Sequence, residues 1–327
     1  MRAGVWLTVL SGLTFGSSGA FAKSVMGAGW SPGATVALRL TGAALVMVLI
    51  AVIVDRRGLL GSLGQLRTVG AYGAIGIALV QATFFFSVQY VPVGVSLMVQ
   101  FLAPIPVMGW NWLMHGQRPG TATIAGAALA LVGAALVIDV VHAGRLSVAG
   151  LAWAAASMLG NAVFLLLSAQ RGRSGGGACG ACGVGEHSGR SSGGVGGHPL
   201  RPVVLLGAGL TVAAATVWLL AAVRLLPVAF GDHPTTLAGH RVPVAVPLAL
   251  LIGISTVIAY LCGVAGAARI GSTLMSLVLL SEVLFAVVLS WLLLGEAVTP
   301  LQMVGGVGVV AGIALAQYRR KAVPSPV

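Results

Sequence analysis

One acidic residue stands inside a long apolar run of the sequence, and its side chain is the best suited to chemistry. Glu282 lies in the middle of the run 271–294, which contains no other charged residue. An ionisable group at that depth of a membrane is costly, so it usually faces the protein interior and has a function. Removal from water disfavours the charged carboxylate, so this side chain is suited to take up and release a proton. Glu282 is therefore a candidate for proton coupling. The alternative is that it accepts structural hydrogen bonds from neighbouring helices.

Two basic residues lie at or near the ends of apolar runs. Arg39 is about two helical turns into the run 32–54, where it could attract an anionic group. Its long side chain could instead reach the membrane interface, and this structural interpretation is the one we favour. Lys23 follows the first apolar run directly and is interpreted as an interface anchor.

Neutral polar and aromatic side chains inside the apolar runs are candidates for lining a solute cavity. Buried amides and hydroxyls need partners, which a water-filled cavity would supply. The alternative is hydrogen bonding between helices, worth about 0.6 kcal/mol on average. Aromatic rings can form apolar pocket walls or can anchor a chain at the membrane interface. The polar candidates are Gln81, Gln100, Asn161, Ser276 and Ser281, and the aromatic candidates are Trp153 and Tyr260.

The remaining reactive residues give no enzyme or metal site. Cys179 and Cys182 form a CxxC pair with His187 and His198 nearby, but the spacing does not fit a usual zinc module. Hydrolysis or group transfer needs paired acids, a histidine cluster or a metal set. The apolar runs hold one central Glu and no His. We therefore expect no enzyme, no cofactor and no metal, and the absence of a phosphate-binding loop gives no support to an ATP-driven pump.

The elements that must position these residues follow from the composition. The chain has 327 residues, of which 58% are hydrophobic and 7% are charged, against about 25% charged residues in a soluble domain. The apolar runs are continuous, which argues against a barrel, and each is long enough for a membrane helix. The sequence predicts an all-α integral membrane protein with ten spans: 4–22, 32–54, 68–89, 93–114, 120–139, 147–169, 203–225, 243–265, 271–294 and 299–318.

The basic residues predict the orientation of these spans. A net charge of +12 would suggest nucleic acid in a soluble protein. Here the charges stand between apolar runs, so no nucleic-acid partner is expected. With both termini in the cytoplasm, 13 of the 18 Lys and Arg residues lie on the inner side. We expect a multi-pass plasma membrane protein that retains its first span, although Ala20-Phe21-Ala22 could also end a cleaved signal peptide.

The chain repeats itself across a glycine-rich segment. Trp112 precedes Trp291 by 179 residues, and the same offset relates Gly126 to Gly305 and Gly133 to Gly312. Five spans is an odd number, so the two halves would cross the membrane in opposite directions, as in many secondary transporters. We therefore predict inverted five-helix repeats over 1–146 and 147–327, with a flexible cytoplasmic linker at 171–200. The small residues near both C-terminal ends of the repeats suggest close packing within one chain, or alternatively a homodimer.

Further motifs resemble those of the EamA-like branch of the drug/metabolite transporter superfamily. Lys23 and Arg39 lie where that family carries Lys and Arg, and the resemblance covers nearly all the chain outside the linker. Gln117 and Val283 depart from the Glu and Pro usual at their places. The further matching residues are Pro104, Gly116, Gly126, Ser281, Glu282, Gly295, Glu296, Thr299, Pro300, Gly305 and Gly306.

The resemblance implies a ten-span carrier, often an exporter of metabolites, amino acids or toxic compounds. The leading hypothesis is therefore a secondary transporter that exports a small organic solute by alternating access, with that solute and membrane lipids as its partners. A flippase for lipids or lipid-linked sugars, from the same superfamily, is the alternative. A channel would need rings of like residues around a pore, and one acid per chain argues against it.

Overall fold

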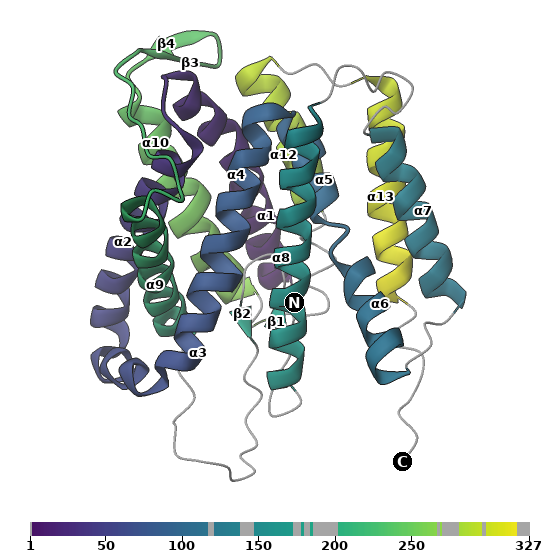
Figure 1. Ribbon diagram of the computed structural model, residues 1–327, viewed down its shortest axis with the longest axis horizontal. Helices are drawn as coiled ribbons and strands as arrows, with labels where there is room; N and C mark the ends of the chain where they lie inside the picture. The colour runs from purple at the N-terminus through teal and green to yellow at the C-terminus, as the bar shows by residue number, and fades with distance from the viewer. Residues whose placement is uncertain are drawn as a thin grey trace.

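The computed structural model is a bundle of helices (Figure 1). It describes residues 2–116, 121–137, 147–172, 178–179, 184–185, 202–266, 269, 281–295 and 299–318. The α-helices are α1 (Arg2–Gly27), α2 (Pro32–Ser62), α3 (Leu66–Ala71), α4 (Val80–Tyr90), α5 (Val93–Gln100), α6 (Pro104–His115), α7 (Thr121–Val137), α8 (Val148–Gly172), α9 (Pro202–Ala222), α10 (Ala245–Ile252), α12 (Ser281–Leu294) and α13 (Pro300–Tyr318).

In the part of the chain that the structure describes, six helices are long and apolar enough to cross a membrane: Arg2–Gly27, Pro32–Ser62, Val69–Tyr90, Val93–Met114, Val203–Ala222 and Ala245–Gly266. Four further apolar helices are shorter in the described residues: Ile124–Gly133, Val148–Val163, Ser281–Leu294 and Met303–Gly312. Each of these ten segments falls on one of the predicted spans.

Two of the predicted spans differ internally from regular α-helix. The π-helix η2 (Tyr72–Leu79) joins α3 to α4, and the π-helix η4 (Gly253–Ile258) continues α10. Residues 259–266 then continue η4 as α-helix. A π-helical turn holds one more residue than an α-helical turn, so it changes which face the following side chains occupy.

The predicted span 93–114 is broken in the middle. α5 ends at Gln100, and Pro104 begins α6 after a short turn. A proline lacks a backbone N–H and clashes with the preceding turn of a helix, whereas its fixed φ suits the first helical position. Pro104 therefore accounts for the start of a new helix at this place.

The connection between α9 and α10 contains a β-hairpin that the sequence analysis missed. Strand β3 (Thr235–Leu237) pairs antiparallel with β4 (His240–Val242). Ala238 and Gly239 form the turn with positive φ values of 52° and 77°, which is the conformation of a tight hairpin turn. Leu293 at the end of α12 accepts a 2.9 Å hydrogen bond from the Ala238 amide. The hairpin therefore lies at the end of the bundle where α1 and α12 also end. A second short pair is formed by β1 (Ala178–Cys179) and β2 (Val184–Gly185).

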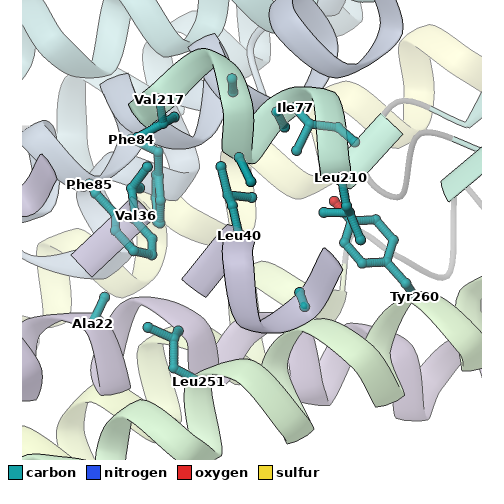
Figure 2. Packing of buried hydrophobic residues seen from close by; sticks show 14 of the residues in the cluster. Ala22, Val36, Leu40, Ile77, Phe84, Phe85, Leu210, Val217, Leu251 and Tyr260 are labelled. Carbon is teal, nitrogen blue, oxygen red and sulfur yellow. The ribbon is translucent and has the colours of Figure 1, made fainter. Parts of the chain in front are cut away.

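Helices that are distant in the sequence pack against one another. α2 packs on α9, and α7 packs on α13 at one edge of the molecule (Figure 1). α1 packs on α12 and on α10–η4, while α8 packs on α4 and α5. The largest buried cluster is made by α1, α2, α4, α9 and α10, as Figure 2 shows for Ala22, Leu40, Phe85, Leu210 and Leu251. The core therefore draws on both halves of the chain.

Glycine allows α7 and α13 to touch through their backbones. A Cβ at Gly133 would lie 2.6 Å from the Gly305 carbonyl oxygen, and one at Gly312 would lie 2.5 Å from the Gly126 carbonyl oxygen. Small residues let helices approach closely where dispersion forces must hold them together. These residues serve packing within one chain, the interpretation that the sequence favoured.

Candidate functional site

A buried arginine is at the centre of the polar residues of the bundle. Arg39 lies on the second turn of α2, about 10 Å along the helix from its first residue. Its side chain is 1% exposed, and no other fully buried side chain among the described residues has a larger volume. The interpretation that Arg39 reaches the membrane interface is therefore wrong, because its guanidinium finds hydrogen-bond partners inside the bundle.

The guanidinium is held by neighbours from two other helical segments. Its Nε donates to the Thr256 hydroxyl oxygen of η4 at 2.9 Å, and its Nη1 donates to the Gln81 amide oxygen of α4 at 3.2 Å. The Thr256 hydroxyl donates in turn to the Leu251 carbonyl oxygen at 2.8 Å, which leaves its oxygen free to accept from Arg39. The Phe85 ring lies 5.1 Å from the guanidinium carbon, within cation–π range.

The sequence-predicted acid is part of the same neighbourhood. Glu282 is buried in the first turn of α12, and both Glu282 and Tyr260 lie near Arg39, where an ionised Glu282 stabilises the guanidinium charge. α1 packs directly on this turn of α12. A Cβ at Gly12 would lie 3.5 Å from the Ser281 hydroxyl oxygen and 3.6 Å from the Glu282 amide nitrogen. Arg39 and Glu282, which stand in different halves of the sequence, are thus brought together by the fold.

Aromatic rings border the polar groups. Tyr260 lies in the helical residues that follow η4, and its ring meets the Phe15 ring edge to face with centroids 4.9 Å apart. Tyr260, Phe15 and Phe85 are all buried. The arrangement combines one cation, one acid and three aromatic rings in an apolar surrounding. Among the described residues of this arrangement there is no nucleophile–base pair and no metal-ligand set.

Hydroxyl groups join α1 to the π-helical region. The Ser11 hydroxyl donates to the Ala259 carbonyl oxygen at 2.8 Å, and the hydroxyl oxygens of Ser17 and Ser255 are 2.7 Å apart. Hydrogen bonds between membrane helices fix their relative position. α1 therefore positions η4, which carries Thr256, as well as α12, which carries Glu282.

Other sequence-predicted residues lie at varied places. Ser281 is half-buried beside α1, Gln100 is half-buried at the end of α5, and Asn161 is half-buried on α8. Trp153 is 39% exposed and stacks on Phe86 with ring centroids 4.9 Å apart, so it lies at the outside of the bundle.

Three further sequence-predicted features are Lys23, Ser276 and the segment that carries the CxxC pair. Lys23 is half-buried near the end of α1. Ser276, Cys182 and nearly all of the linker 171–200 lie outside the described residues. Within the described ranges, no group of three His, Cys, Asp or Glu residues could hold a metal ion.

Sequence reasoning missed three members of the site. Thr256 and its neighbour Ser255 are a polar pair inside the apolar run 243–265, so their types could have marked them. Phe85 and Phe15 carry no such signal, because phenylalanine is common in apolar runs. Their role follows only from the helix rotations that the fold imposes.

Comparison with known proteins is consistent with this architecture. The model of a family described as the EamA-like transporter family matches residues 2–139 and 204–318. One solved structure, described only as the crystal structure of a protein, aligns with 99% of this chain and 100% of its own, with a TM-score of 0.61 and 18% sequence identity. At this identity the likeness shows the fold alone. A search of curated proteins found no match.

Proposed function

Because the chain belongs to the EamA-like transporter family, a family of membrane transporters, we propose that it is a secondary carrier. It moves a small organic solute across the membrane by alternating access between two inverted repeats. The single observation that carries the proposal is the position of Arg39. Its guanidinium is buried between helices of both halves and hydrogen-bonded to one residue from each.

The pattern of helix packing supports the inverted repeats. The first helices of the two halves are α1 and α8. The packing of α1 against α12 then corresponds to the packing of α8 against α5. In the same way, the packing of α1 against η4 corresponds to the packing of α8 against α4. The pairs α2 with α9 and α7 with α13 each join corresponding helices. The π-helices η2 and η4 also stand in the third span of their halves. On this basis the halves are 1–146 and 147–327, with ten spans.

The location of the polar groups supports a solute site between the halves. Gln81 and Arg39 come from the first half, and Thr256, Tyr260 and Glu282 come from the second. Relative motion of the halves would therefore change the surroundings of the solute, which is what alternating access requires.

Glu282 is proposed to couple solute movement to protons. Glu282 is 7% exposed and lies near a buried cation, so protonation of its carboxyl group would change the local charge balance with little screening by water. Alternate protonation and solute binding would drive export. The hairpin end would face outward in the plasma membrane and the termini inward, as the exposed Arg56 and Arg57 near the end of α2 and the exposed Arg67 in α3 suggest.

The experiment measures flux of labelled small solutes in proteoliposomes with and without an imposed pH gradient. Wild type is compared with Glu282→Gln and with Asp232→Asn, a matched change at an exposed acid in the α9–α10 connection. We expect gradient-driven flux in wild type and Asp232→Asn, and flux that ignores the gradient in Glu282→Gln.

Each other outcome removes a defined part of the proposal. Gradient-driven flux that survives in Glu282→Gln would refute proton coupling through this residue while leaving the carrier. A different result is that no organic solute moves while labelled lipid moves between the leaflets. This result would refute the solute carrier and favour the flippase alternative. The family match gives that alternative no support.

A further inference from the structure

We propose that Arg39 is the anchor for a carboxylate group of the transported solute, and that the solute carries an apolar body beside that group. The inference rests on the proposed carrier function and deepens it by naming the chemical class of the solute. It starts from the hydrogen bonds that the guanidinium makes and from those that it leaves available.

A guanidinium carries five N–H donors in one plane. Within the described part of the chain, Nε donates to Thr256 and Nη1 donates once to Gln81. Both acceptors are neutral. Three N–H groups, one on Nη1 and two on Nη2, then have no acceptor among the described residues, and the outer edge of the guanidinium lies between these two nitrogens. Two parallel N–H groups on that edge match the two oxygens of a carboxylate.

The three anchors also fix the orientation of this edge. Thr256 holds the inner nitrogen, Gln81 holds one outer nitrogen, and the Phe85 ring lies 5.1 Å from the guanidinium carbon. A guanidinium that is already oriented loses little freedom when it binds an anion, which strengthens binding. The side chain is therefore built to present its outer edge and is not free to turn.

Burial favours an anionic partner. Arg39 is 1% exposed and its hydrogen-bonding partners are uncharged. A buried charge is costly unless an opposite charge compensates it. Glu282 supplies part of this compensation electrostatically. When Glu282 takes up a proton, that part is lost, and the carboxylate of a solute could replace it.

Charge and shape narrow the class of solute further. Arg39 carries one positive charge, which one carboxylate balances, and Glu282 in its ionised form would repel any second negative charge. A monoanionic carboxylate is therefore favoured over a dianionic phosphonate or phosphate. The rings of Phe15, Phe85 and Tyr260 are buried around the polar groups. Apolar side chains of this kind bind the body of a ligand while a few polar groups orient it.

The test measures binding separately from transport. The full chain in lipid nanodiscs is titrated by calorimetry with 3-phenylpropionate, its neutral amide 3-phenylpropionamide and 2-phenylethylphosphonate. The titrations are run at a pH above the second pKa of the phosphonate, where this probe is a dianion. Variants are Arg39→Gln, which removes the charge, Arg39→Lys, which keeps the charge without the planar edge, and Lys23→Gln as the control. Thermal unfolding of each variant checks that it is folded.

We expect wild type and Lys23→Gln to bind the carboxylate at least about 10-fold more tightly than the amide, the ratio that one charge-assisted hydrogen bond gives. Arg39→Gln should lose this preference for the carboxylate and still bind the amide. Arg39→Lys should show a preference smaller than that of wild type and larger than that of Arg39→Gln. The phosphonate should bind more weakly than the carboxylate, and Glu282→Gln should reduce that difference. If Arg39→Gln does not fold, Arg39→Lys carries the test.

Equal binding of carboxylate and amide by wild type, an unchanged preference in both Arg39 variants, or no binding of any probe would overturn the anchor. A carboxylate preference without flux in proteoliposomes would leave the anchor and refute the carrier. Gradient-driven flux without a carboxylate preference would leave the carrier and refute the anchor. The two proposals therefore fail in distinguishable ways.

Discussion

A Cβ at Gly16 would lie 2.9 Å from the carbonyl oxygen of Glu282, so α1 touches the backbone of α12 at the level of its buried acid. The same Cβ would lie 2.9 Å from the Ala286 amide nitrogen. A side chain cannot be accommodated between two backbones by a change of rotamer. The position of Glu282 relative to the rest of the bundle therefore depends on the absence of a side chain at Gly16.

Gly16→Ala is expected to destabilise the protein and to reduce flux. The added methyl group must push α1 away from α12, and overpacking of this kind costs about 1–3 kcal/mol. The matched control is Gly70→Ala in α3, where a Cβ would meet nothing within 4 Å. Because alanine favours helix over glycine, the control should unfold at the same or a higher temperature. Equal thermal stability of the two variants would contradict the close approach of α1 and α12.

Thr256→Val is expected to lower the stability of the protein and the rate of flux while keeping the volume of the side chain nearly unchanged. It removes the acceptor of the Arg39 Nε group, and an unsatisfied buried donor costs about 1–3 kcal/mol. Thr256→Ser keeps the hydroxyl and should restore most of the stability and flux. The measurement is thermal unfolding together with the rate of solute flux. A valine variant as stable and as active as wild type would show that this hydrogen bond does not matter. A serine variant as impaired as the valine variant would show that the Thr256 methyl group contributes as much as the hydroxyl group.

Tyr260→Leu is expected to reduce flux more than Trp153→Leu. Tyr260 is 5% exposed, packs on Phe15 and lies near Arg39, whereas Trp153 is 39% exposed and stacks on Phe86. The loss of Tyr260 therefore alters the site, and the loss of Trp153 alters the outer surface of α8. Initial rates of flux at equal protein content check this order. The reverse order would place the solute beside α8.

The sequence was sufficient to predict the helices and several of their details. Apolar runs of membrane length predicted ten helical segments, and each of the ten apolar helices among the described residues falls on one of them. α2 loses helical φ and ψ angles at Asp55, directly after the predicted end of its span. These features depend on local composition and on backbone chemistry, which a sequence records directly.

Features that depend on tertiary packing could not be predicted. The π-helices η2 and η4 arise in segments whose residues equally suit an α-helix. The burial of Arg39 depends on Thr256 and Gln81, which stand 217 and 42 residues away.

The β3–β4 hairpin, in contrast, was predictable in principle, because Ala238-Gly239 stands between threonine- and valine-containing segments.

A disulfide between Ser24→Cys and Thr235→Cys is expected to block transport. The Ser24 and Thr235 hydroxyl oxygens are 3.2 Å apart, and they join the end of α1 to β3. Sulfur atoms at these positions would be close enough to bond with small adjustments of the backbone. If this end of the bundle opens during alternating access, the covalent bond holds it closed.

The disulfide variant is made in a chain whose Cys179, Cys182 and Cys262 are replaced by serine, so that no other pair can form. Flux should stop on oxidation and return on reduction, while each single-cysteine variant should be unaffected by either treatment. Unchanged flux in a fully oxidised double variant would mean that α1 and β3 stay together throughout the cycle. The opening at the hairpin end would then have to occur between other helices, with α1, β3 and α12 moving as one body.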